Sequence, residues 1–213
     1  MRHPKKHIEP PCKTKIRLAA IRLFADRGID NVAVKDIMRT ARTTQPMLYY
    51  YFGCKDKLCE RIYGDLMSEA VNGAGGIMAS KASLEAKLAD LFTFHSTFFA
   101  SHPGATRFIL QGFLSPHYGR IFKDVRERMM AVHALNLERM VKYHIRTGEV
   151  SDDNSRELFS LIDGLTLHFM INHSNTPEER AKRSTPSRLA AFIRKGLGTA
   201  GTLLLDIWLI AKA

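Results

Sequence analysis

Few residues in this sequence have the types and the spacing that catalysis or metal binding requires. His168 and His173 lie five positions apart, which places them off a common helical face, and no cysteine or carboxylate pattern completes a metal site around them. The sequence contains no nucleophile–base–acid arrangement and no glycine-rich phosphate loop. We therefore expect a protein that is not an enzyme and that holds no metal or cofactor.

Residue types suited to a different chemistry gather in the stretch TTQPMLYYYFGCKDKL at positions 43–58. Three consecutive tyrosines and a phenylalanine follow a proline there, and either a buried strand or a helix that presents some of them to a partner could account for them. Met47, Leu48, Tyr51 and Phe52 recur at helical spacing, and no strand pattern with period-two alternation lies nearby. The aromatic run is therefore predicted to lie on a helix and not in a buried strand.

The positive charge of the chain is concentrated around this stretch. The 213 residues carry a net charge of +11, with a pI near 9.8. Residues 1–63 hold 14 Lys and Arg against six Asp and Glu, a net charge of +8, which leaves +3 for the other 150 positions. Such a concentration favours a polyanionic partner, either nucleic acid or an anionic membrane surface.

Cysteine usage and hydropathy indicate the compartment. The three cysteines, Cys12, Cys54 and Cys59, form an odd and sparse set that argues against a disulfide scaffold. The most apolar run, GTLLLDIWLIAKA, is interrupted by Asp206 and is too short to span a bilayer, and the N-terminus lacks the apolar core of a signal peptide. We expect a cytoplasmic protein that has no membrane partner.

The elements that must position residues 43–58 follow a helix-turn-helix pattern. From Thr14 to Gly28 the apolar residues repeat with the period of one amphipathic helix, and a second, short helix fits residues 34–40. Thr44 can cap the helix that follows, with Pro46 in its first turn. In such a layout one helix braces and the next enters the major groove of DNA, although plain helical bundles can show the same spacing.

Three signatures in residues 14–60 carry a resemblance to a known family. The pattern Ala-Ala-x-x-Leu-Phe-x-x-x-Gly occupies positions 19–28, and the hydrophobic-basic-acidic-Ile start of a second helix is VKDI at positions 34–37. LYYYFGCKDKL at positions 48–58 is similar to Leu-Tyr-x-[His/Tyr]-Phe-x-[Ser]-Lys-[Glu/Asp]-x-Leu. Together they resemble the DNA-binding domain of the TetR family of bacterial transcription regulators, over less than a third of the chain.

The resemblance implies DNA-contacting roles for one group of residues. Gln45 has the side chain for bidentate contact with adenine, and Pro46 and Met47 can touch a thymine methyl group. Tyr49 and Tyr50 are expected to point outward to phosphates, whereas Leu48 and Phe52 point into the core. The full set of expected DNA contacts is Lys35, Arg42, Thr44, Gln45, Pro46, Met47, Tyr49, Tyr50, Tyr51 and Lys55.

The sequence departs from the family pattern at three positions. Arg42 occupies the turn where the family has Gly, which costs about 1 kcal/mol in a left-handed conformation, although the guanidinium group can meet a phosphate. Ala33 replaces the Thr that usually caps the second helix, and Cys54 replaces a Ser. Cys54 next to Lys55 at a helix start is a setting in which a thiol can act as a redox switch. The simpler interpretation, a small residue in place of Ser, stays open.

The remainder of the chain is predicted to form a larger helical domain. GAGG at positions 73–76 is expected to separate one long helix from the next, and HPGATRF and GFLSPHYG are expected to be turns. Helices are predicted at residues 84–101, 118–147 and 156–173, and a last helix is predicted to start after Thr185 and Pro186.

Two functions are expected of this domain. The last two helices offer wide apolar faces, which pack either within the subunit or, as in the family, against a second subunit. The expected dimer-interface residues are Leu158, Leu161, Ile162, Leu165, Phe169, Leu189, Ile193, Leu197, Ala200 and Leu204. A ligand pocket follows from the resemblance alone, and its candidate lining, for which ordinary core packing is the alternative, is Phe92, His95, Phe99, Phe108, Phe113, Met129, Met130 and His133.

The sequence therefore predicts an all-α homodimer with a flexible basic arm at residues 1–12, a three-helix helix-turn-helix DNA-binding domain at 13–60 and a larger helical ligand-binding and dimerisation domain at 61–213. We expect a transcription regulator, and a repressor in particular, that binds a palindromic operator in double-stranded DNA and is released by a small apolar or aromatic ligand. The alternative is a carrier of hydrophobic small molecules whose basic head binds anionic surfaces without sequence preference.

Overall fold

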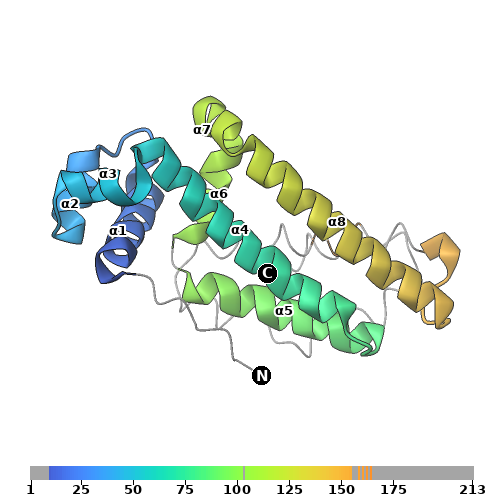
Figure 1. Ribbon diagram of the computed structural model, residues 1–213. Coiled ribbons are helices and arrows are strands. Elements are labelled where there is room, and N and C mark those ends of the chain that lie inside the picture. The colour runs from blue at the N-terminus through green and yellow to red at the C-terminus, as the bar shows by residue number, and fades with distance from the viewer. Residues whose placement is uncertain are drawn as a thin grey trace, which may run out of the picture. The chain divides into compact units, whose positions relative to one another are not determined.

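The computed structural model describes residues 10–102 and 104–154 and positions 158, 160, 162 and 164 (Figure 1). Every regular element within these residues is a helix, which confirms the predicted all-α class. The α-helices in chain order are α1 (Pro11–Arg27), α2 (Val34–Ala41), α3 (Gln45–Phe52), α4 (Lys55–Ala79), α5 (Leu84–Ser101), α6 (Ala105–Leu114), α7 (Pro116–Ile121) and α8 (Lys123–Arg146), followed by a single 3-10 turn at Asp152–Asn154.

The chain divides into two compact units whose boundaries fall within α4 and α8. The first unit contains the described residues of Met1–Leu66 and Pro103–Arg126, and the second contains those of Met67–His102 and Glu127–Ala213. The helix-turn-helix therefore shares its unit with α6 and α7, which the boundary predicted at position 60 assigns to the other domain. Side chains of α6 pack on α1, and this contact explains the grouping.

The first unit is built on an aromatic core. The ring of Phe24 on α1 stacks on Phe108 of α6, with 5.7 Å between centroids. Tyr63 of α4 stacks on Phe122, with 4.3 Å between centroids, and Tyr118 of α7 packs on the same ring at 5.7 Å. All five side chains are buried. Burial of this aromatic surface stabilises the unit, because each large apolar side chain contributes about 1.5–3 kcal/mol.

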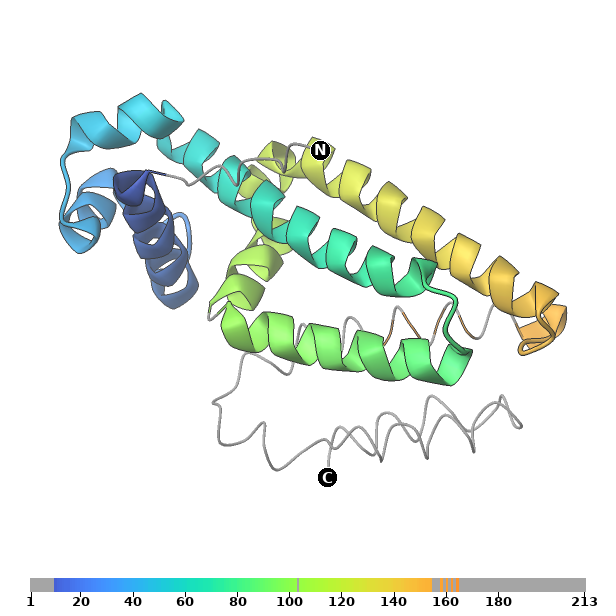
Figure 2. The ribbon, with the colours of Figure 1, turned by 60° about the horizontal axis from the view of Figure 1, so that its bottom comes forward.

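The second unit is a packed layer of long helices. The second half of α4 lies alongside α5 and α8 (Figure 2). Their buried apolar side chains form one cluster, which consists of Ala74, Met78, Leu84, Leu88, Leu91, Leu137, Met140, Val141, Val150, Leu158 and Ile162. The observed bounds of α5 agree with the predicted helix at 84–101.

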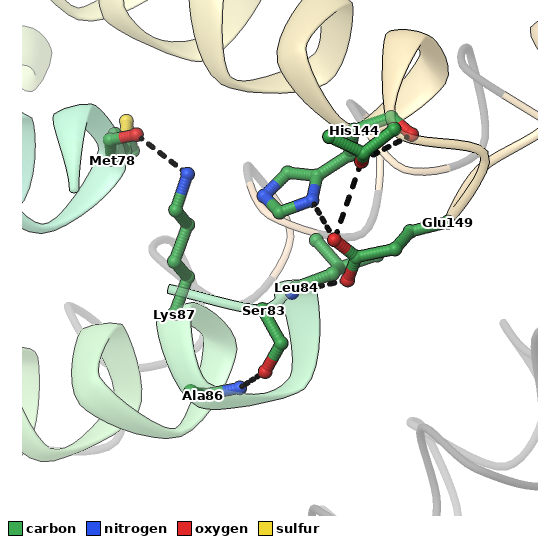
Figure 3. A network of polar contacts seen from close by, with 8 residues as sticks. Met78, Ser83, Leu84, Ala86, Lys87, His144 and Glu149 are labelled. Atoms are coloured by element: carbon green, nitrogen blue, oxygen red, sulfur yellow. Dashed lines mark hydrogen bonds and ion pairs between the residues drawn. The ribbon is translucent and has the colours of Figure 1, made fainter. Parts of the chain in front are cut away.

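A polar network joins three helix ends of this unit (Figure 3). Glu149, just beyond α8, accepts the backbone N–H of Leu84 at 2.8 Å and the Nδ1–H of His144 at 3.1 Å. Lys87 donates from Nζ to the carbonyl oxygen of Met78 at 3.1 Å and lies 4.6 Å from the ring centroid of Tyr143. Burial lowers the pKa of Lys87. The hydrogen bond to the N–H of Leu84 is the main reason that the pKa of Glu149 lies below its usual value.

The prediction that GAGG separates two helices is wrong. Helix α4 continues through positions 73–76 and ends at Ala79. A Cβ atom at Gly73 would lie 2.2 Å from the ring of Phe94, and one at Gly75 would lie 2.5 Å from the amide of Asn136. These glycines therefore serve close packing of α5 and α8 against α4, which outweighs the modest cost of glycine inside a helix.

The two turns predicted at HPGATRF and GFLSPHYG are also largely helical. Helix α6 covers residues 105–114 and α7 covers residues 116–121. Ser115 accepts the backbone N–H of Tyr118 at 3.3 Å, and Pro116 opens α7 at a position where a missing N–H costs little. The helix predicted at 118–147 is accordingly two helices, interrupted at Phe122.

Most of the predicted dimer interface lies outside the described residues. Leu158 and Ile162 are described, and both are buried in the cluster of the second unit, which is the within-subunit packing that the sequence left open. The other eight positions, Leu161, Leu165, Phe169, Leu189, Ile193, Leu197, Ala200 and Leu204, lie outside the described residues, as do His168 and His173. No helix among the described residues is long and apolar enough to cross a membrane.

Candidate nucleic-acid interface

Helix α3 is anchored through one face and presents the other to solvent. Leu48 is fully buried and Phe52 is buried, whereas Tyr49 and Tyr50 are 48% and 79% exposed. The predicted division of the aromatic run into outward and inward residues is therefore confirmed. The helix ends at Gly53, whose φ of 78° is a conformation that suits glycine and whose N–H donates to the carbonyl oxygen of Tyr49 at 2.9 Å.

The first turn of α3 is exposed around a hydrogen bond between two side chains. Thr44, Gln45 and Pro46 are exposed and Met47 is half-buried. Nε2 of Gln45 donates to Oη of Tyr49 at 3.2 Å, one helical turn further along. Thr44 has the extended backbone of a capping residue but accepts no side-chain hydrogen bond from the helix. Its hydroxyl group is therefore not used as the predicted cap.

The turn between α2 and α3 is left-handed at Arg42, the position where the sequence departs from the glycine of the family pattern. This residue has φ 51° and ψ 51°, the left-handed conformation, and its side chain is exposed. The turn closes through the N–H of Thr43, which donates to the carbonyl oxygen of Met38 at 3.0 Å. Cys12 of α1 shares a hydrogen bond with the hydroxyl group of Thr43 at 3.3 Å, so the first turn of α1 braces the turn that positions α3.

Helix α2 begins without a capping side chain, as predicted from Ala33. Asp36 compensates in part, because its carboxylate accepts the backbone N–H of Ala33 at 3.3 Å. The other oxygen of Asp36 pairs with Arg39 at 3.0 Å. Lys35 has an exposed side chain at the start of the same helix.

The side chain of Lys55 is engaged inside the unit. Its Nζ donates to the carbonyl oxygen of Ile29 at 2.6 Å and lies 5.9 Å from the ring centroid of Tyr118. The Lys55 side chain is half-buried, and the phosphate contact that the resemblance implies stays a prediction. Cys54 is exposed at the start of α4, where its Sγ accepts the N–H of Lys57 at 3.5 Å. Its role here is a helix cap.

Two long-range contacts of α6 and α7 were not predicted from the sequence: Gln111 holds the loop between α1 and α2, and Tyr118 contacts Asp56 of α4. The amide group of Gln111 donates to the carbonyl oxygen of Phe24 and accepts the N–H of Ile29, both at 3.0 Å. Burial raises the pKa of Tyr118, so its phenol stays protonated and donates to Asp56 at 3.3 Å. Because the partners are between 62 and 87 positions apart, no local pattern in the sequence indicates these contacts.

The candidate ligand residues are divided between the two units. Phe108 belongs to the aromatic core of the first unit, whereas Phe92, His95 and Phe99 are buried on α5 in the second unit. Nδ1 of His95 lies 2.7 Å from the carbonyl oxygen of Leu91, one turn earlier in the helix. On α8, Met129 and His133 are half-buried and Met130 is 40% exposed, while the side chain of Phe113 lies outside the described set.

Comparison with known proteins identifies the first unit. Residues 16–62 match the family model described as bacterial regulatory proteins, tetR family. The chain is 20% identical over 191 residues to the uncharacterized HTH-type transcriptional regulator YvdT of Bacillus subtilis (strain 168), a match that covers 87% of this chain and 95% of that protein. It is 25% identical over 91 residues to the HTH-type transcriptional repressor NicS of Pseudomonas putida, over 43% of each chain.

Solved structures extend the likeness over both units. The TetR family regulator PfmR from Thermus thermophilus matches with a TM-score of 0.66 at 17% identity, covering 85% of this chain and 96% of that one. The fatty acid degradation regulator FadR from Bacillus halodurans matches with a TM-score of 0.64 at 17% identity, covering 89% and 96%. At this level of identity the likeness shows the shared fold. Residues 16–62, which include the exposed α3, thus match the tetR family model, and the fold over most of the chain is similar to that of TetR family regulators.

Proposed function

We propose that this protein is a cytoplasmic repressor that binds a palindromic operator as a homodimer and leaves it when a small apolar molecule binds. The observation that carries the DNA part is the exposed first turn of α3, where Gln45, Pro46 and Tyr49 stand on a helix anchored by Leu48 and Phe52. The family consists of regulators, so the chain is not an enzyme.

The proposed role of each residue on DNA is assigned from the exposure of its side chain. Gln45, with Pro46 and Met47 beside it, reads base edges in the major groove. Lys35 and Tyr50 are exposed and contact phosphates. The other proposed phosphate contacts are Arg42, Thr44, Tyr49 and Tyr51. Lys55 has a partner inside the unit, and we propose that it positions the start of α4 and does not contact phosphate.

Dimerisation supports this proposal on physical grounds. One α3 contacts only a few base pairs, and two copies related by a twofold axis read two half-sites about 34–36 Å apart. We propose that the apolar face predicted at residues 189–204 supplies the contact between subunits. Sedimentation of the full chain at micromolar concentration tests this point, and a monomer that still binds a palindrome tightly would contradict it.

The decisive experiment is the selection of bound duplexes from a random DNA pool at physiological salt. We expect an enriched palindrome, and we expect Gln45→Ala to lose about 1–3 kcal/mol of binding free energy on it while relaxing preference at one base pair of each half-site. If binding weakens as the salt concentration rises and no sequence is enriched, the basic N-terminal domain is instead a surface that binds polyanions without sequence preference.

The ligand part of the proposal rests on composition. The residues after position 63 are nearly neutral, and the aromatic side chains of Phe92 and Phe99 are buried in the second unit. We propose an apolar or aromatic ligand, and the likeness in fold to FadR, a fatty acid degradation regulator, makes fatty acids a reasonable first panel. Release of a fluorescent operator by one member of the panel, and not by detergent-free buffer, is the expected result.

A further inference from the structure

The hydroxyl group of Tyr49 has a use within the protein before any DNA is present. Gln45 and Tyr49 are four residues apart on α3, so their side chains lie on one face, and Nε2 of Gln45 donates to Oη of Tyr49 at 3.2 Å. Both side chains are exposed. Tyr50, the next residue, is turned elsewhere, with its ring edge against Tyr51 at 5.0 Å.

The hydrogen bond between Gln45 and Tyr49 leaves available the amide atoms of Gln45 that can contact a base. A glutamine amide has two N–H donors and one carbonyl acceptor. One N–H is taken by Tyr49, and the second N–H and the carbonyl oxygen remain for N7 and N6 of an adenine, the bidentate pairing that glutamine makes in the major groove. Because Oη of Tyr49 acts as acceptor in this bond, its own proton stays available for a phosphate oxygen.

The bond also fixes a side chain that otherwise moves freely. An exposed glutamine populates many rotamers, and ordering it on binding is unfavourable in free energy. Tyr49 has only two side-chain torsions, and its helix is anchored by Leu48 and Phe52, so it is a firm support. A preorganised amide loses less entropy when it meets its base than a free one does.

We infer that Tyr49 is a positioning residue for base reading, which holds the amide of Gln45 in the orientation that selects one base pair. This inference rests on the proposed function and adds specificity to a tyrosine that otherwise contributes only a phosphate contact. Its consequence is that removing one exposed hydroxyl group reduces discrimination between sequences as well as affinity.

The test is a double-mutant cycle on full-length protein with Tyr49→Phe, Gln45→Ala and the combined variant. Dissociation constants are measured on the selected operator and on duplexes substituted at each base pair in turn. We expect Tyr49→Phe to reduce discrimination at the base pair read by Gln45 by about threefold to tenfold, part of what a bidentate pairing supplies. In the Gln45→Ala background the same change should leave discrimination unaltered.

Tyr50→Phe is the matched control, since it removes a neighbouring exposed hydroxyl group that has no bond to Gln45. It is expected to weaken all duplexes equally. If Tyr49→Phe does the same, or has no effect, Tyr49 is a phosphate contact or a bystander and the inference is overturned. A uniform loss for Gln45→Ala also overturns it and leaves the regulator intact. If the wild-type protein showed no preference among duplexes, the proposed function itself would be excluded.

Discussion

The side-chain carbonyl oxygen of Gln111 accepts the backbone N–H of Ile29 at 3.0 Å. The same amide donates to the carbonyl oxygen of Phe24 at 3.0 Å, so one side chain of α6 bridges the last turn of α1 and the residue just beyond Gly28. Gly28 itself turns the chain, with φ 83°. The path from α1 to α2, and hence the place where the helix-turn-helix begins, is held from outside the DNA-binding motif.

Replacing Gln111 tests this bridge. Gln111→Met keeps the length of the side chain but leaves the half-buried N–H of Ile29 without its acceptor, and we expect a loss of about 1–3 kcal/mol in the free energy of unfolding. The only other glutamine of the chain, Gln45, is exposed, and Gln45→Met is expected to change stability by less than about 0.5 kcal/mol. Equal midpoints in urea for the two variants would contradict the bridge.

Arg42 is expected to lower the stability of the fold and to strengthen DNA binding. Its left-handed backbone, with φ 51°, is unfavourable for any residue with a Cβ atom, and Arg42→Gly is expected to stabilise the fold by up to about 1 kcal/mol. The same change removes an exposed positive charge from the proposed phosphate contacts. We expect weaker DNA binding and a salt dependence whose log–log slope is smaller by about one.

Arg42→Lys separates the two effects, since lysine has the same backbone strain and keeps the charge. Its stability should match that of the wild type, and its DNA affinity should lie between those of the wild type and Arg42→Gly. If Arg42→Gly bound DNA as tightly as the wild type at every salt concentration, the phosphate contact would be excluded.

The sequence predicted the DNA-binding elements better than the rest because their signals are local. The outward Tyr49 and Tyr50 and the inward Leu48 and Phe52 follow from spacing within one or two helical turns. Contacts between distant segments could not be predicted. Lys55 bonds to Ile29, 26 positions away, and no local pattern indicates this contact.

The failure at GAGG has a related cause. Glycine inside a helical pattern usually marks an end, and nothing near positions 73–76 indicates that Phe94 and Asn136 press against them from other helices. Packing between helices decided the outcome there. Helix α7 escaped prediction for a different reason, because a Ser-Pro pair such as Ser115–Pro116 can begin a helix as well as a turn.

Two buried tyrosines that pack on Phe122 make a matched pair for stability measurements. The hydroxyl group of Tyr63 has no hydrogen-bond partner among the described residues, and burial raises its pKa to about 12. That of Tyr118 donates to Asp56 at 3.3 Å. Tyr63→Phe should leave the free energy of unfolding unchanged or raise it by about 1 kcal/mol, because a buried group without a partner is removed.

Tyr118→Phe should instead lower the free energy of unfolding by about 1 kcal/mol, since a made hydrogen bond is lost. Both variants keep the aromatic packing, so urea titrations at neutral pH compare the hydroxyl groups alone. Destabilisation by Tyr63→Phe as large as that by Tyr118→Phe would mean that the Tyr63 hydroxyl group has a partner.

The acid sensitivity of the second unit is expected to come in part from Glu149. The pKa of this carboxylate is lowered, first by the N–H of Leu84 and then by His144, so the folded state favours the charged form. A carboxylate with a lowered pKa stabilises the fold above the usual Glu value of about 4.5. That stabilisation is lost as the pH falls through the lowered pKa that Glu149 has in the folded state, because the folded state then takes up the proton as well.

Glu149→Gln should therefore be less stable than the wild type at pH 7, and the difference should shrink steadily below about pH 4. Glutamine still accepts the N–H of Leu84, so a difference that persists at low pH would assign the effect to geometry and not to charge. Glu138→Gln is the control on the surface: Glu138 pairs with Lys142 in solvent, and its replacement should change stability little at any pH. Chemical unfolding at a series of pH values measures the free energy of unfolding of all three proteins. If Glu138→Gln lost as much stability as Glu149→Gln, the buried partners of Glu149, which are His144 and the N–H of Leu84, would add nothing to the stability that its carboxylate contributes.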